Sequence, residues 1–117
     1  MIATLLFLAI LSQESTPALP RVALGHGFIE DCRVDPNTTP GWDALVKKAR
    51  CLYYLEGLSD GLARGGLLCV PAQVTLGQTQ AVVLKYLEDH PEILHEPRSI
   101  IAREALLKHW ACRPARK

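Results

Sequence analysis

The sequence has no excess charge of either sign, few aromatic side chains and no apolar run long enough to span a bilayer. Its 117 residues carry 13 Lys+Arg and 12 Asp+Glu, a formal net charge of +1, which gives no electrostatic basis for a nucleic-acid partner. Aromatic residues make up 6% and there is one Met, so Leu, Val, Ile and Ala must build the core. With 49% hydrophobic residues the chain is too apolar to stay disordered, and its length suits one small domain.

The N-terminal segment predicts export. Residues 2–11 form an apolar run without a charged residue, and the small and polar residues SQESTPA follow it. About ten residues are too few to cross a bilayer but match the hydrophobic region of a secretory signal peptide. We expect a signal peptide over residues 1–18, cut after Ala18 or, as second choice, after Ser15. The mature domain, residues 19–117, is then periplasmic and not stably inserted in a membrane; an N-terminal helix docked on the core is the alternative.

The expected export of the protein decides how its cysteines are interpreted. The chain has four, an even set in a protein expected to be exported, where disulfides form: Cys32, Cys51, Cys69 and Cys112. Structural zinc sites bring cysteines in close pairs such as CxxC, and no such pair is present. A redox pair needs the same spacing. We therefore expect two disulfides, no metal and no cofactor.

The spacing of apolar residues predicts helices and no sheet. Phe28, Ile29 and Cys32 share one face of a short helix over residues 25–33. A long helix follows, and its stripe with a 3.6-residue period comprises Trp42, Leu45, Val46, Ala49, Leu52, Tyr53, Leu55, Leu58 and Leu62. No alternating pattern typical of a strand appears. The fold class is therefore all-α, a small four-helix bundle stapled by two disulfides.

Local signals predict where the helices begin. Thr39 is expected to cap the long helix, with Pro40 at its first position. Thr75 and Gln78 form the T-x-x-Q pattern of a capping box, which opens the third helix. Pro97 begins the last helix.

Glycine and proline mark the segments between and within the helices. Residues 65–73, punctuated by Gly65-Gly66 and a proline, predict an ordered connector, and residues 90–97 predict a bend. Gly57 and Gly61 lie inside the long helix, where glycine costs about 1 kcal/mol relative to alanine. We expect another element to approach the helix closely at one of them.

Helix positions favour one of the three pairings open to four cysteines. Cys32, at the end of the short helix, can reach Cys51 in the middle of the long one. Cys69, in the connector, can reach Cys112 at the end of the last helix. On the chain-entropy model these closures stabilise the fold by about 3 and 4 kcal/mol, which approaches the whole stability of a small domain.

No arrangement of side chains in the sequence predicts catalysis. The histidines, His26, His90, His95 and His109, lack the i, i+4 spacing of a helical metalloprotease site. Ser59-Asp60 lacks the strand-turn-helix context of a hydrolase nucleophile. We expect no catalytic residues and no enzymatic activity.

Several segments together resemble a known family. The strings CLYYLEGLSDG, CVPAQVTLGQ, VVLKYLEDHPEILHEP and ALLKHWAC resemble the Rap/Tai family, periplasmic immunity proteins that neutralise peptidoglycan amidase toxins delivered by type VI secretion. With Cys32 included, the resemblance spans residues 28–112. The sequence departs from the family pattern at Tyr53, where a glycine is expected, and at Ala111, where a proline is expected. Neither position belongs to the disulfide frame.

The resemblance implies a non-catalytic protein that caps the active site of one cognate secreted amidase. We expect the binding patch on the connector or on the bend, with the binding energy concentrated in Leu67, Leu68, Ile93 and Leu94. Packing of these side chains on the bundle is the alternative, above all for Leu68 and Ile93, and a homodimer stays open. The competing function is a small periplasmic helper or acid-stress chaperone, which binds many partners and exposes apolar surface at low pH.

Overall fold

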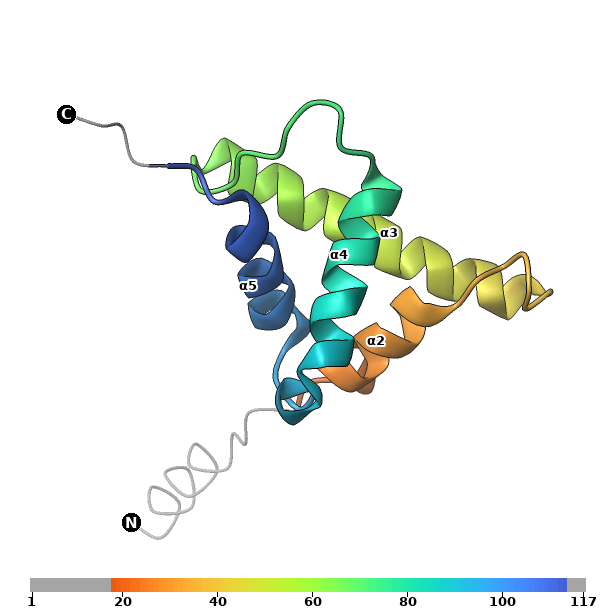
Figure 1. Cartoon of the computed structure of the whole chain (residues 1–117). Helices are drawn as coiled ribbons and strands as arrows, with labels where there is room; N and C mark the ends of the chain where they lie inside the picture. The colour runs from red at the N-terminus through yellow and green to blue at the C-terminus, as the bar shows by residue number, and fades with distance from the viewer. Residues whose placement is uncertain (1–17, 114–117) are drawn as a thin grey trace, which may run out of the picture.

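The computed structural model describes residues 18–113, so the signal peptide expected over residues 1–18 lies outside the described residues except for Ala18. The described chain contains these elements in order: η1 (Arg21–Ala23), α2 (Gly25–Arg33), α3 (Trp42–Arg64), α4 (Leu76–Asp89), η2 (Pro91–Ile93) and α5 (Arg98–Trp110). Four α-helices and no strand within that range confirm the all-α class. In Figure 1, α3 crosses α4, while α2 and α5 lie on either side of α4.

The short helix α2 lies at the centre of the packing. Phe28 is fully buried, and the backbone amides of Gly25 and His26 donate to the carbonyl oxygens of Glu96 and Leu94 at 2.9 and 2.8 Å. A Cβ at Gly25 would lie 2.6 Å from Ile101 Cδ1 and 2.8 Å from the Leu94 Cα. Only glycine fits this close approach between α2 and the bend.

The long helix α3 begins two residues later than predicted. Its N-cap is Gly41, with a φ of 126°, and no side chain caps the helix. The expected Thr39 cap is therefore wrong. The Thr39 amide donates to the carbonyl oxygen of Asp35 at 2.9 Å, which places it in a turn before the helix. The left-handed conformation of Gly41, which glycine adopts without strain, then redirects the chain into α3.

The expected close approach at Gly57 or Gly61 is also wrong. A Cβ built at either position would meet nothing within 4 Å, and both glycines are exposed. The predicted apolar stripe of α3 is only partly buried: Leu55 is in the core and Leu58 and Leu62 pack against it, whereas Trp42, Leu45 and Tyr53 are 79%, 52% and 70% exposed. Ala44 and Cys51, which lie outside that stripe, are buried instead. The cause is that α2, α4 and α5 cover α3 from one side.

The capping box of α4 is confirmed. Thr75 Oγ1 accepts from the Gln78 amide at 3.1 Å, and Gln78 Oε1 accepts from the Thr75 amide at 2.7 Å. The helix ends at Asp89, and η2 forms the expected bend before α5. The fully buried side chains of the core come from α2, α3, α4 and α5: Phe28, Cys51, Leu55, Val83, Leu87, Ile101, Ala102, Ala105 and Leu106.

Candidate functional site

The connector, residues 65–73, is fixed to the last helix. The disulfide Cys69–Cys112 joins the two segments, as predicted. The Cys69 amide donates to Trp110 O at 2.8 Å, and the Cys112 amide donates to Leu67 O at 3.0 Å. Figure 1 shows the chain arching away from the bundle between α3 and α4 after this anchor. A surface loop with a covalent and a hydrogen-bonded anchor keeps little conformational freedom.

The two leucines of the connector face opposite ways. Leu67 is 47% exposed, whereas Leu68 is 3% exposed and belongs to the core cluster. Beyond the disulfide, the exposed residues of the connector are Pro71, Ala72 and Gln73. Of the apolar pair expected to contact a partner, Leu67 is accessible, and Leu68 holds the backbone against the bundle.

The bend, residues 90–97, is turned inward. Ile93 and Leu94 are half-buried and pack against the core, while Glu92 and His95 are exposed. The connector and the bend lie at opposite ends of α4, which has 14 residues and is therefore about 20 Å long. The structure does not bring the four expected contact residues into one patch.

The second predicted disulfide, Cys32–Cys51, ties α2 to α3 inside the core. Beside it, the guanidinium of Arg50 donates from Nε and Nη2 to the two carboxylate oxygens of Asp31, both at 2.8 Å. Asp31 is 2% exposed. The hydrogen bonds to this carboxylate raise the pKa of Arg50. A buried carboxylate held by a bidentate guanidinium fixes α2 and α3 in register.

Sequence reasoning missed this ion pair, although a signal was present. Asp31 and Arg50 each directly precede a cysteine of the predicted disulfide, so closing Cys32–Cys51 brings them together. The other disulfide does the same for Leu68 and Ala111, which form an antiparallel bridge.

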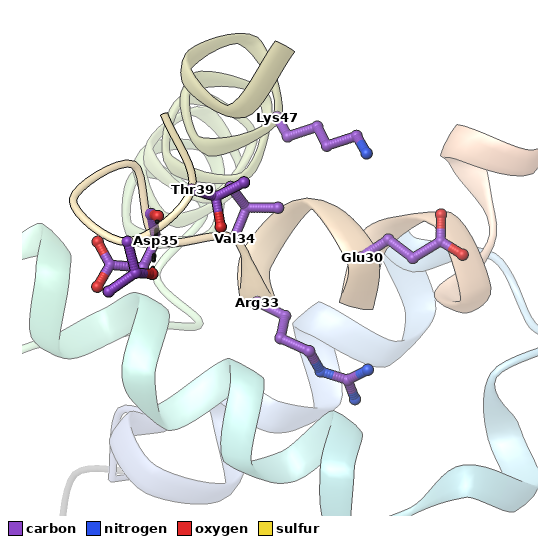
Figure 2. Close-up of a pocket in the computed structure, with 7 residues that line it drawn as sticks. Glu30, Arg33, Val34, Asp35, Thr39 and Lys47 are labelled. Carbon is purple, nitrogen blue, oxygen red and sulfur yellow. Dashed lines mark hydrogen bonds between the residues drawn. The ribbon is translucent and has the colours of Figure 1, made fainter. Parts of the chain in front are cut away.

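A cavity of about 370 Å³ opens between the end of α2, the following loop and α3. Figure 2 shows Lys47 on α3 and Glu30 and Arg33 on α2, with their charged ends apart from one another. Glu30 pairs with Arg21, which lowers the pKa of its carboxyl, and Lys47 Nζ lies 3.3 Å from Asp43. These charged groups are engaged by neighbours and do not converge on one point where a substrate could sit.

The contacts of His90 are with a nearby residue of its own helix end. His90 stacks on Tyr86 with ring centroids 4.2 Å apart, and its Nδ1 lies 2.8 Å from Tyr86 O. Over residues 18–113, no three His, Cys, Asp or Glu side chains gather where a metal ion could be held. In the same range, none of the helices combines the length and the apolar character that a membrane crossing needs.

The fold and the connector define a small helical, disulfide-bonded protein with an anchored loop suited to binding. The family model of the Rap1a immunity proteins matches residues 25–112, well over half of the chain. The protein belongs to the family of Rap1a immunity proteins, which confirms the resemblance found in the sequence. Comparison with curated proteins and with solved structures gave no further match. Membership implies that the chain binds a cognate toxin, and immunity proteins in general act by binding rather than by catalysis.

Proposed function

We propose that this protein is a periplasmic immunity protein that binds and blocks a peptidoglycan amidase toxin delivered by type VI secretion. The family supports immunity against a secreted toxin. The two disulfides support an oxidising compartment, and the expected signal peptide supports export. The observation that carries the proposal is the exposure of Leu67 on a connector anchored at Cys69–Cys112.

The connector suits an inhibitor because it is ordered before binding. Its anchor consists of the disulfide and the two backbone hydrogen bonds between residues 67–69 and 110–112. Insertion of such a loop into an enzyme cleft costs less conformational entropy than insertion of a flexible one. Leu67 then supplies an apolar anchor, and Pro71 and Ala72 supply stiff, small surface beside it.

The bend is the weaker candidate for direct contact. Ile93 and Leu94 already pack on the core, so a toxin at this end of α4 would meet Glu92 and His95 instead. We therefore assign the direct apolar contact to Leu67. Leu68, Ile93 and Leu94 contribute to binding by holding the two segments in place.

Binding of candidate secreted amidases from the same genome, measured by calorimetry with single variants of this protein, tests the proposal. Leu67→Ala should weaken binding about 30-fold, because an apolar anchor at the centre of an interface contributes about 2 kcal/mol. The melting temperature should stay unchanged, since the side chain is half exposed. The matched control is Ile100→Ala on α5, where the side chain is 46% exposed and lies near the other end of the bundle.

Three results would separate the alternatives. Unchanged affinity in Leu67→Ala with a loss in Glu92→Ala or His95→Ala would move the site to the bend. Equal losses in Leu67→Ala and Ile100→Ala would refute a local anchor. No binding to any secreted wall hydrolase, together with broad suppression of aggregation at low pH, would favour the chaperone-like function.

A further inference from the structure

The two disulfides differ in their access to solvent. Cys32 and Cys51 belong to the buried core cluster. Cys69 is exposed on the connector, and Cys112 is half-buried just beyond the end of α5. A thiolate breaks a disulfide by attacking one of its sulfur atoms, so the rate depends on how accessible that atom is. In the folded protein, Cys69–Cys112 is therefore the bond that a reductant can reach.

Two backbone hydrogen bonds accompany this disulfide between the connector and the end of α5. The Cys69 amide donates to Trp110 O at 2.8 Å, and the Cys112 amide donates to Leu67 O at 3.0 Å. Leu67 is exposed and Trp110 is half-buried, so the pairing lies at the surface. A hydrogen bond contributes little net stability where water can replace either partner. Opening the disulfide therefore leaves a pairing that separates readily.

The two ends of the connector are held without this disulfide. At the α3 end, Leu68 is buried in the core, and its amide donates to Leu62 O at 3.3 Å. At the α4 end, Thr75 is fixed by the capping box. The residues between these points, 69–74, are mostly exposed. They are the part of the connector whose position depends on the disulfide.

We propose that Cys69–Cys112 is a thiol–disulfide exchange site, that its reactant is a dithiol, and that its state decides whether residues 69–74 are fixed. One thiolate of the dithiol attacks Sγ of Cys69, forms a mixed disulfide and displaces Cys112 as a thiolate, which takes up a proton. The second thiol of the dithiol attacks the mixed disulfide and releases Cys69 as a thiol. The dithiol leaves as a disulfide, so two electrons and two protons have passed to the protein. The reverse reaction closes the bond.

The half-reduced protein keeps its fold. Cys32–Cys51 remains closed inside the core, and beside it Arg50 holds the carboxylate of Asp31 with two hydrogen bonds of 2.8 Å. The buried side chains of α5, such as Leu106, lie before Cys112 and pack on the bundle rather than on the connector end. The protein therefore has two folded states, and these differ in the connector.

The two states differ in what binding costs. In the oxidised state, residues 69–74 are fixed before a partner arrives. In the half-reduced state, binding must also order these residues, and the lost conformational entropy weakens it. This consequence rests on the proposed function: with the bond open, the toxin should bind about 10-fold more weakly, or weaker still. Immunity then depends on the oxidation of one exposed disulfide after export.

Hydrogen exchange of the oxidised protein and of its open forms tests the two states without a toxin. Dilute dithiothreitol gives the half-reduced protein, in which peptide mapping must find Cys32–Cys51 still closed, and Cys69→Ser/Cys112→Ser gives the open state without a reductant. In both forms the amides at positions 69 and 112 should exchange about 10-fold faster or more. The helical circular dichroism should stay unchanged. The internal control is the His26 amide, which donates to Leu94 O at the bend and should keep its exchange rate.

Two results would overturn the proposal at this stage. Unchanged exchange at positions 69 and 112 would show that the hydrogen bonds alone fix the connector. Loss of the helical signal in both open forms would show that no second folded state exists.

Calorimetry with an amidase that the wild type binds tests the consequence for the toxin. Cys69→Ser/Cys112→Ser should bind about 10-fold more weakly or weaker, whereas the Ile100→Ala control should bind like the wild type. Equal affinity of the double variant, together with faster exchange, would overturn the role of this bond in binding. If the wild type binds none of the amidases, the proposed function fails, while the exchange rates still decide whether the connector has two states.

Discussion

Replacing Gly57 and Gly61 by alanine should stabilise the protein. Both glycines lie inside α3, both are exposed, and a Cβ at either would meet nothing within 4 Å. Alanine is favoured over glycine in a helix interior by about 1 kcal/mol, because glycine loses more backbone entropy on folding. Each variant should therefore raise the free energy of unfolding by about 0.5–1 kcal/mol, and the double variant by about 1–2 kcal/mol.

The control is the same substitution at a crowded position. In Gly25→Ala the new Cβ would overlap Ile101 Cδ1 at 2.6 Å and the Leu94 Cα and carbonyl oxygen at 2.8 Å. The Leu94 atoms belong to backbone that accepts a hydrogen bond from α2, so they cannot move without cost. We expect a loss of about 2–3 kcal/mol, typical of overpacking in a closed site.

Thermal and urea denaturation of the oxidised protein measures both effects. A change of 1 kcal/mol shifts the melting temperature of a domain of this size by about 4–8 °C. The alanine variants of α3 should melt higher by about that amount, and Gly25→Ala should melt lower by at least twice as much. Destabilisation by Gly57→Ala or Gly61→Ala would refute the inference that this part of α3 is free of neighbours in residues 18–113.

Further measurements test the frame around the connector. Peptide mapping without reductant should find the disulfides Cys32–Cys51 and Cys69–Cys112. A dilute dithiol should reduce Cys69–Cys112 first, because Cys69 is exposed while Cys32 and Cys51 are 2% and 0% exposed. The reverse order of reduction would contradict these burials. Thr75→Ala should cost about 1 kcal/mol in urea denaturation by removing the capping box. Thr39→Ala, at an exposed position in the loop before α3, is the near-neutral control. Burial of the Tyr54 hydroxyl raises its pKa above the ordinary value of about 10, because the folded protein favours the neutral phenol. The folded state therefore loses stability as the pH rises from about 10 through this raised pKa. The melting temperature should fall over that pH window, and Tyr54→Phe should flatten the fall.

Features encoded by neighbouring residues could be predicted from the sequence. The helix over residues 25–33, the Thr75 capping box and the bend before Pro97 each depend on residues a few positions apart, and the structure confirms them. The disulfide pairing could be predicted because the expected helix positions bring the cysteines close together in only one of the three pairings.

Features that depend on distant segments could not be predicted in the same way. The periodicity of α3 gave a broad apolar stripe, but only the placement of α2, α4 and α5 decides that Leu55 is buried while Trp42 and Tyr53 are exposed. The sequence also does not distinguish Leu67 from Leu68, which are adjacent and chemically identical although the first is exposed and the second is buried. The backbone at Ala111 and Cys112 pairs with the connector through an isolated bridge to Leu68 and a hydrogen bond to Leu67 O, and this pairing turns Leu68 inward.

We propose that this chain protects cells from a secreted amidase through its connector. Its test is the survival of cells that export a candidate secreted amidase from the same genome together with this protein or its Leu67→Ala variant. The wild type should protect fully, with a dissociation constant on the order of nanomolar, and Leu67→Ala should protect less at equal periplasmic abundance. Lysis of cells that contain abundant, oxidised wild-type protein would contradict it.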